Sequence, residues 1–205
     1  MANPLTVKIA LLAWTIQSGA ALGAAAAGDA TPASRPIHEF FRSGNGLGCT
    51  LSREETAWIT RGGNVAEIGY MPCLTIGPIK LEMTRLDVEQ ILGPHNRIVP
   101  SASGEHRTYL IRVADRMVAY WVVTYVGDRV TAAQLTGGAT PQNHRLSGLA
   151  LGESVVKLVE KLGPPGSKRA MQESGAELWS YAPWPISFEI KAGVITSMRS
   201  ARPGK

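Results

Sequence analysis

The stretch IKLEMTRLDVEQILGP, residues 79–94, aligns with LALGESVVKLVEKLGP, residues 149–164, at a constant offset of 70 residues. Both stretches place a hydroxyl residue, Thr84 or Ser154, where a helix N-cap belongs, and both end in Gly-Pro, which stops a helix. Between these points apolar residues recur at helical spacing. The sequence therefore predicts two short, capped helices at equivalent places in two copies of one unit.

The segments that follow the two helices also match each other. Each helix is followed by a polar loop and then by short runs of alternating apolar and polar residues between turn signals, a pattern typical of antiparallel strands. In the first copy the predicted strands are Thr108–Val113, Val118–Val126 and Arg129–Leu135. In the second copy they are Glu177–Tyr181, Ile186–Ile190 and Val194–Met198. Each copy is thus expected to be one helix packed on a three-stranded meander.

The fold class predicted by this pattern is α+β, with two tandem repeats that are each a short helix packed on an antiparallel β-meander. Repeat 1 is placed at residues 76–138 and repeat 2 at residues 145–201. One helix on three strands buries little apolar surface, so the two copies are expected to share a core or to extend one sheet across both.

In the second repeat, Leu151-Gly152-Glu153-Ser154, Leu162-Gly163-Pro164-Pro165 and Trp179-Ser180-Tyr181 form a pattern that resembles the SmpA/OmlA-type outer-membrane assembly lipoproteins. A duplicated, exported helix-plus-meander unit also resembles the beta-lactamase inhibitor protein fold. The first repeat departs from the pattern, because Glu82 replaces the glycine before the cap and no second proline follows Pro94. The resemblance implies a non-catalytic module that binds another protein, either in envelope assembly or as an inhibitor.

The N-terminal residues 1–27 have the features of a secretory signal peptide. One cation, Lys8, precedes an apolar run that is too short to span a bilayer, and Ala25-Ala26-Ala27 forms an A-x-A cleavage site. A buried N-terminal helix is the alternative interpretation. No cysteine follows the apolar run directly, so no lipid anchor is expected. The sequence therefore predicts a soluble periplasmic or secreted chain that begins near Gly28 and has no membrane anchor.

The only two cysteines, Cys49 and Cys73, are expected to form one disulfide in the oxidising compartment that export implies. This bond would close an N-terminal subdomain at residues 49–75. Residues 28–48 are rich in Gly, Ala, Pro and Ser and are expected to be a flexible N-terminal segment.

Within the subdomain, Leu51–Arg61 is predicted to form a short helix capped by Ser52 and ended by Gly62-Gly63. Val65–Tyr70 then has the pattern of a brief strand.

The predicted strand Val118–Val126 is apolar on both of its faces. A sheet covered by a helix on one side usually carries polar residues on the other, so an aromatic face of this sheet is either exposed or buried between the repeats. If it is exposed, it would bind a protein, because large aromatic side chains are common interface anchors. The predicted protein-binding residues are Tyr109, Trp121, Tyr125, Trp179, Tyr181 and Trp184.

No catalytic motif is present in the chain. The serines lack a G-x-S-x-G context. The histidines, His38, His95, His106 and His144, lack metal-ligand spacing. We therefore predict no catalytic residue, no metal site and no cofactor. The alternative function is a small envelope enzyme or a binder of a cell-wall or other small ligand. That function would use polar loop residues such as Glu105, His106 and Arg107.

The formal net charge of the 205 residues is +5, and loss of Lys8 with the leader would lower it to +4. The cations are scattered along the sequence, and an exported protein rarely meets nucleic acid, so ordinary solvated surface charge is expected. The alternative is that the positive charge binds an anionic envelope polymer or an acidic partner. The leading hypothesis is an exported, non-catalytic protein-binding module, inhibitor-like or an envelope scaffold, whose partner is another envelope or extracellular protein.

Overall fold

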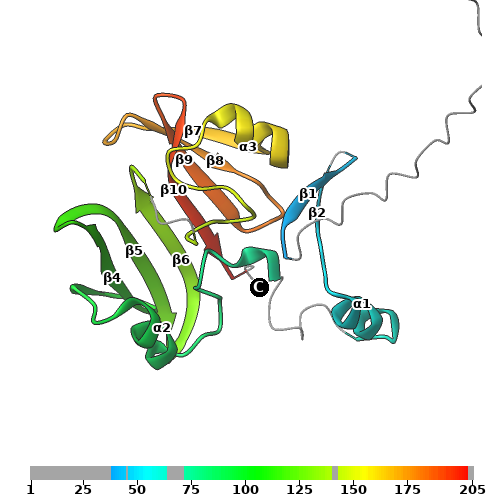
Figure 1. The fold of residues 1–205 in the computed structure, drawn as a ribbon, viewed down its shortest axis with the longest axis horizontal. Coiled ribbons are helices and arrows are strands. Elements are labelled where there is room, and N and C mark those ends of the chain that lie inside the picture. Colours follow the sequence, from blue (N-terminus) through cyan, green and yellow to red (C-terminus); the bar gives the residue numbers. More distant parts are fainter. Residues whose placement is uncertain (1–37, 45, 64–71, 140–142, 203–205) are drawn as a thin grey trace, which may run out of the picture. The chain divides into compact units, whose positions relative to one another are not determined.

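The structure is a computed structural model that describes residues 38–44, 46–63, 72–139 and 143–202. Its main element is one antiparallel sheet of eight strands in the order β3-β4-β5-β6-β10-β9-β8-β7 (Figure 1). The strands are β3 (Arg97–Ser101), β4 (Gly104–Val113), β5 (Arg116–Val126), β6 (Arg129–Gly137), β7 (Ser167–Met171), β8 (Ala176–Ser180), β9 (Ile186–Lys191) and β10 (Val194–Ala201). The predicted α+β class is confirmed, and no helix in the described ranges is long and apolar enough to cross a bilayer.

Two helices accompany the large sheet, and each precedes four of its strands. Helix α2 (Arg85–Leu92) is followed by β3 to β6, and helix α3 (Val155–Leu162) by β7 to β10. The last strand of each series, β6 or β10, lies at the centre, where the two pair with each other. One sheet therefore extends across the first half of the fold, which consists of α2 and β3 to β6, and the second half, which consists of α3 and β7 to β10.

The helix boundaries follow from the capping residues that the sequence predicted. The Thr84 hydroxyl accepts a hydrogen bond from the Asp87 backbone N–H, and the Asp87 carboxylate accepts one from the Thr84 N–H, which completes a capping box. Ser154 accepts the equivalent bond at α3. Gly93 and Gly163 end the two helices, both with a φ of 80°, a conformation that favours glycine.

The two halves share a further detail in the central strands. The register shifts by one residue at Thr131 in the pairing of β5 with β6, and at Thr196 in the pairing of β9 with β10. The hydroxyl of Thr131 donates to the Thr124 carbonyl at 3.3 Å, and that of Thr196 donates to the Glu189 carbonyl at 3.1 Å. Each bulge lies two residues after the strand's bridge to a helix N-cap, which joins Thr84 to Arg129 and Ser154 to Val194.

The two edge strands differ from the prediction. Polar loops were expected where the structure has β3 and β7, so each half has four strands instead of three. Both segments are mostly exposed and lack apolar alternation, and β3 contains Pro100, which cannot donate to a ladder. Proline is tolerated at an edge because one side of an edge strand has no partner.

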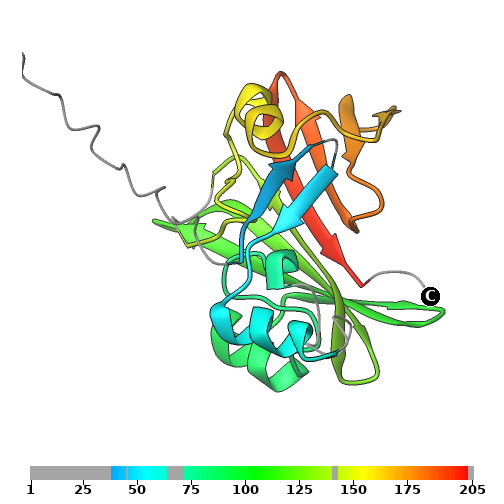
Figure 2. The same ribbon diagram turned by 90° about the vertical axis from the view of Figure 1, so that its right-hand side faces the viewer.

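The prediction that residues 28–48 form a flexible segment is wrong for its described part. Strands β1 (Phe40–Ser43) and β2 (Gly46–Cys49) form a hairpin that lies in front of the second half in Figure 2. The Phe40 side chain is 1% exposed, and its ring meets Trp184 edge to face with centroids 5.1 Å apart. The Phe40 backbone N–H also donates to Ser147 Oγ at 2.9 Å. Phe40 is one of the contacts that hold the hairpin against the second half, and the composition of the segment does not indicate it.

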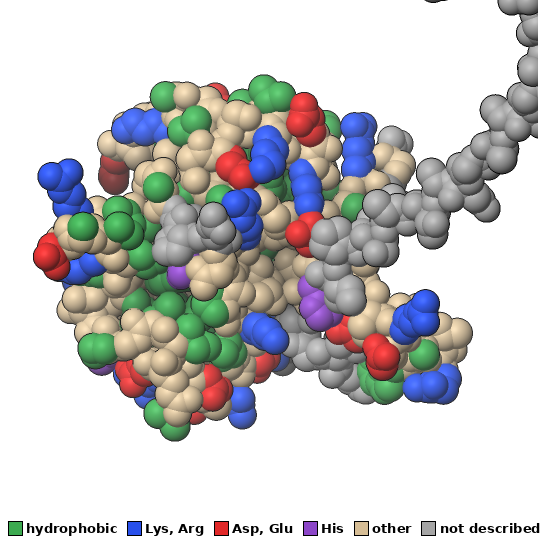
Figure 3. All heavy atoms as spheres, in the orientation of Figure 1, with side chains coloured by type: hydrophobic (Ala, Val, Ile, Leu, Met, Phe, Trp, Pro, Cys, Tyr) green, Lys and Arg blue, Asp and Glu red, His purple; other side chains and the backbone are tan. Residues whose placement is uncertain are grey.

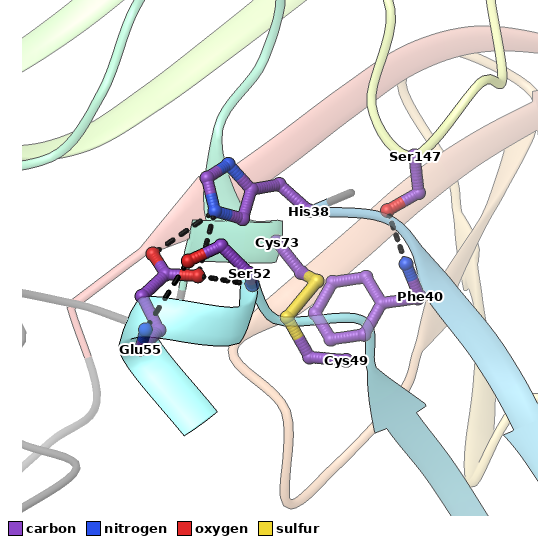
Figure 4. Close-up of a disulfide and its surroundings, with 7 residues drawn as sticks. All are labelled: His38, Phe40, Cys49, Ser52, Glu55, Cys73 and Ser147. Carbon is purple, nitrogen blue, oxygen red and sulfur yellow. Dashed lines mark hydrogen bonds and ion pairs between the residues drawn. A yellow bond between two sulfur atoms is a disulfide. The ribbon is translucent and has the colours of Figure 1, made fainter. Parts of the chain in front are cut away.

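The predicted disulfide is present between Cys49 and Cys73, whose Cα atoms are 5.9 Å apart (Figure 4). It joins the end of β2 to a short 3-10 helix, η2 (Pro72–Leu74), whose residues Cys73 and Leu74 are buried. The bond therefore fastens the hairpin to the core beneath it.

The helix predicted after Cys49 is also confirmed, as α1 (Arg53–Thr60). Ser52 caps it through a reciprocal pair of hydrogen bonds with Glu55, which also bonds His38 at 3.0 Å (Figure 4). None of the residues of α1 is buried. The predicted signal peptide, its cleavage site and the predicted strand Val65–Tyr70 lie outside the described residues.

Candidate binding surfaces

The structure buries five of the six aromatic residues that the sequence nominated as a binding surface. Tyr109, Trp121 and Tyr125 are at most 1% exposed, and Trp179 and Tyr181 are 6% and 3% exposed. Of the two possibilities for the aromatic face, exposed or buried, the structure has the buried one. These five side chains cannot contact a partner in this conformation.

Three of the buried aromatic residues, Tyr109, Trp121 and Trp179, belong to a row that crosses six of the eight strands. Its members pair in register from β4 to β8 and are Tyr109, Trp121, Leu135, Met198, Phe188 and Trp179. They form the core with residues of the helices, of η2 and of the β1–β2 hairpin, including Val88, Leu158, Leu74 and Phe40. We call this side of the sheet the covered face. Residues from both halves of the sheet share this core.

Trp184, the sixth aromatic residue, is only partly buried. It lines a cleft of about 260 Å³ between the hairpin and the end of α3. Other lining residues include Arg42, Leu47, Tyr181 and Pro183. This cleft therefore places a nominated aromatic residue, Trp184, beside solvent-accessible space.

A polar cluster interrupts the covered face in the first half. The Arg107 guanidinium is 11% exposed and donates to Glu105 Oε1 at 2.7 Å and to Glu89 Oε1 of α2 at 2.5 Å. Arg85 of α2 forms a second ion pair with Glu105 at 3.2 Å. His95 adds a contact to Glu89 at 3.2 Å. These bonds tie α2 to β4, and every charge in the cluster has an opposite charge beside it.

Two tyrosines lie beneath this cluster. The Tyr109 and Tyr125 hydroxyls are hydrogen-bonded at 3.0 Å, and the guanidinium of Arg107 lies 5.8 Å from the Tyr125 ring centroid. Burial raises the pKa of both tyrosines, so both stay protonated at neutral pH. Neither is prepared to act as a phenolate base.

The residues nominated for a catalytic or ligand site do not converge. Glu105 and Arg107 lie on the covered face, whereas His106 lies on the opposite face and bonds the Thr124 hydroxyl at 2.9 Å. His38 and His95 each contact a different glutamate. No group of three or more His, Cys, Asp or Glu residues within the described part of the chain is arranged to hold a metal ion.

The opposite side of the sheet, which we call the open face, is defined by two rows of side chains that pair across the strands. The first row consists of Arg97, Thr108, Val122, Gln134, Arg199, Ser187, Ser180 and Ser167. The second consists of Leu110, Tyr120, Thr136, Ser197, Glu189, Leu178 and Arg169. All of these side chains except Ser197 are partly or fully exposed.

Polar side chains in the middle of the open face hold one another in place. The Gln134 amide nitrogen lies 2.9 Å from Ser197 Oγ, 3.3 Å from Thr136 Oγ1 and 3.4 Å from Glu189 Oε1. Burial raises the pKa of Glu189, while the bond from Gln134 opposes this shift. Arg199 is exposed beside this network and makes no hydrogen bond or ion pair with any described residue.

The open face differs in charge from the helix-bearing surface. Figure 3 shows basic and acidic side chains next to each other in the orientation of Figure 1. Examples are the pairs of Lys157 with Glu153 and of Lys161 with Glu39. The two rows of the open face instead contain three arginines and one glutamate. Arg199 and Tyr120 were not among the predicted site residues, because strand alternation separates the two faces of a sheet without indicating which face is covered.

No protein-family model matches the chain, and no curated protein matches it. Among solved structures, a DUF4309 family protein from Bacillus subtilis is similar, with 15% identity and a TM-score of 0.41 over 63% of this chain and 82% of that chain. A cysteine-rich secretory protein from Staphylococcus aureus has 14% identity and a TM-score of 0.39, and an extracellular protein containing an SCP domain from Bacillus anthracis has 13% and 0.39. Each of these two matches spans 60% of this chain and 44% of the other protein's chain. Similarity this low assigns neither a family nor a function, and the resemblance to assembly lipoproteins and to the beta-lactamase inhibitor protein stays a prediction.

Proposed function

We propose that this protein is an exported, non-catalytic protein-binding module that binds another envelope or extracellular protein through the open face of its sheet. The observation that carries the proposal is an eight-stranded sheet with one face filled by helices and hairpin and the other face uncovered by described elements. The longer of the two uncovered rows crosses eight strands, which corresponds to about 34 Å at the usual strand spacing. A surface of that length suits a macromolecular partner better than a small ligand.

The apolar part of the open face supplies the contact area. Leu110, Tyr120 and Val122 are neighbours in register on β4 and β5, and all three are partly exposed. Tyrosine and aliphatic side chains bury much area at low entropic cost when they enter an interface. The binding residues proposed from the structure thus replace the buried aromatic residues proposed from the sequence.

The module consists of two tandem repeats in this proposal. The bulges at Thr131 and Thr196 support the duplication, as do the matched helix caps. Residues 70 positions apart, Ile76 and Leu146, also form a bridge with each other. A chain duplication in which the two copies pair around a local two-fold axis explains these contacts together.

Export is supported by the disulfide between Cys49 and Cys73, because such bonds persist in oxidising compartments. The partner would then be an envelope or extracellular protein, and the mature module would be periplasmic or secreted.

Site-specific photo-crosslinking tests the proposal. Benzoylphenylalanine in place of Tyr120 should give a discrete adduct with a second protein in intact cells or culture medium. The matched control is the same residue in place of Val156, which is 61% exposed on α3, away from the open face. Adducts only from position 156, or from neither position, would contradict binding through the open face.

A second candidate function rests on the cleft beside Trp184. Its volume of about 260 Å³ and its mixture of apolar walls and one cation, Arg42, suit a small amphipathic ligand such as a cell-wall fragment. Titration with soluble muropeptides, followed by nuclear magnetic resonance of the indole N–H groups, separates the two candidates. A saturable shift of the Trp184 signal that Arg42→Ala removes would favour the ligand binder.

A further inference from the structure

We propose that the partner of the open face is an acidic protein surface that places a carboxylate against Arg199, an inference that rests on the proposed function. Arg199 lies in the middle of the sheet, directly between Gln134 on β6 and Ser187 on β9. Its guanidinium can offer five N–H donors to a ligand.

The charge of the open face supports an anionic partner. Its two rows contain Arg97, Arg169 and Arg199 but only one acid, Glu189. None of these three arginines is paired with a described residue, whereas Arg107, in the core, is bonded to two glutamates. The excess of positive charge is therefore available to an incoming surface, where complementary charge raises association rates and selects the partner.

The surroundings of Arg199 keep it available. Glu189, in the neighbouring row, is the acid nearest to Arg199 in the strand register. Its carboxylate accepts a hydrogen bond from the Gln134 amide and forms no ion pair with Arg199. The Gln134 amide is in turn occupied by Ser197 and Thr136. The neighbours thus satisfy one another and leave the guanidinium for an external acceptor. A carboxylate is the planar acceptor that arginine binds with two parallel hydrogen bonds.

The apolar residues beside Arg199 favour a protein over an anionic polymer. Val122 lies two strands from Arg199 in the same row, and Tyr120 lies in the next row. A polymer such as polyphosphate has uniform charge and no apolar group that would fill this half of the face. An acidic protein surface offers carboxylates and apolar side chains together, which matches both halves of the open face.

The inference is tested with two defined probes and the purified, oxidised protein. The probes are a fluorescent glutamate–tyrosine copolymer, as an acidic polypeptide with aromatic side chains, and polyphosphate, as a non-protein polyanion. We expect the copolymer to bind more tightly than polyphosphate by fluorescence anisotropy. Arg199→Glu should weaken copolymer binding at least about tenfold, and about 1 M NaCl should do the same, because the Debye length then falls to about 3 Å. Arg53→Glu on α1 makes the same charge change away from the open face and should have little effect.

Each alternative outcome contradicts a different statement. Equal copolymer binding by the wild type and Arg199→Glu would contradict the proposal that an acidic partner binds Arg199. Tighter binding of polyphosphate than of the copolymer would indicate that the partner is a non-protein polyanion. The crosslink at position 120 separates these results from the proposed function. If that adduct persists unchanged in Arg199→Glu, the open face binds a protein that is not recognised through Arg199. If the adduct is absent from the wild type as well, the proposed function itself fails.

Discussion

Gln134 and Arg199 lie directly opposite each other where β6 pairs with β10, at the middle of the eight-stranded sheet. In the proposed duplication they are equivalent residues, since each lies three positions after a bulged threonine. The first half has an amide there that binds its neighbours, and the second half has a cation that pairs with no described residue. In that proposal, one position of the repeat carries two different chemical roles.

Glu189 provides a pH-dependent test of the network around Gln134. Burial raises the pKa of its carboxyl, so at neutral pH the ionised form is less stable in the folded protein than in the unfolded chain. Glu189→Gln should therefore increase the free energy of unfolding at pH 7, by about 0.5 kcal/mol. The gain should vanish as pH falls below the ordinary glutamate value of 4.5, where both states are protonated. Urea unfolding at several pH values measures this, and a loss of stability at pH 7 would contradict it.

Arg107 should show strong coupling to Glu89. Arg107→Met leaves two carboxylates without their main counterion and should cost about 2 kcal/mol, less than for a fully buried pair because Glu89 is partly exposed. Val159 occupies the place of Glu89 on α3, so Glu89→Val is compatible with the helix. The double variant Arg107→Met, Glu89→Val should therefore cost less than the sum of the single variants. Additive losses in chemical unfolding would show that the pair is not coupled.

Glu82 and Gly152 test the backbone strain before the helix caps. Both have positive φ, 65° and 82°, although only Gly152 is a glycine. Gly152→Ala should cost about 2 kcal/mol, because it adds backbone strain and because its Cβ would lie 2.9 Å from the Gly138 carbonyl oxygen. Glu82→Gly should be close to neutral in thermal unfolding, since relief of strain offsets the loss of its exposed ion pair with Arg202.

Gly175→Ala is the matched control for this comparison. Gly175 also has positive φ, 65°, but no atom lies within 4 Å of the Cβ position. It should lose about 1 kcal/mol from backbone strain alone. Equal losses at positions 152 and 175 would show that the contact with Gly138 has no cost.

The disulfide should stabilise the protein by about 3 kcal/mol, as expected for a loop closed between residues 24 positions apart. The double variant Cys49→Ser, Cys73→Ser should lower the unfolding midpoint while the far-ultraviolet circular dichroism of the large sheet is retained. The Trp184 fluorescence should also change, because the β1–β2 hairpin that packs on it through Phe40 loses its attachment to η2. Unchanged stability under reducing conditions would contradict this account.

Local signals in the sequence were sufficient for the helices and for the inner strands. Thr84 and Ser154 predicted both helix starts, because an N-cap depends on residues only a few positions away. The edge strands were missed because Arg97–Ser101 and Ser167–Met171 are exposed and carry no alternation. The β1–β2 hairpin was missed because its docking depends on long-range contacts, such as those that Phe40 makes with residues more than 100 positions away.

The sequence by itself determined the fold class, the helix caps and the pairing of two cysteines, since each follows from short-range chemistry or from residue count. Only the tertiary structure decided which face of the sheet is covered. Alternation along β5 separates Trp121 and Tyr125 from Tyr120 and Val122, but it is equally compatible with either set lying inside. The helices, η2 and the hairpin cover the first set, and this leaves the second set, with Arg199 beside it, on the surface. The residues of the proposed binding site are therefore fixed by long-range packing.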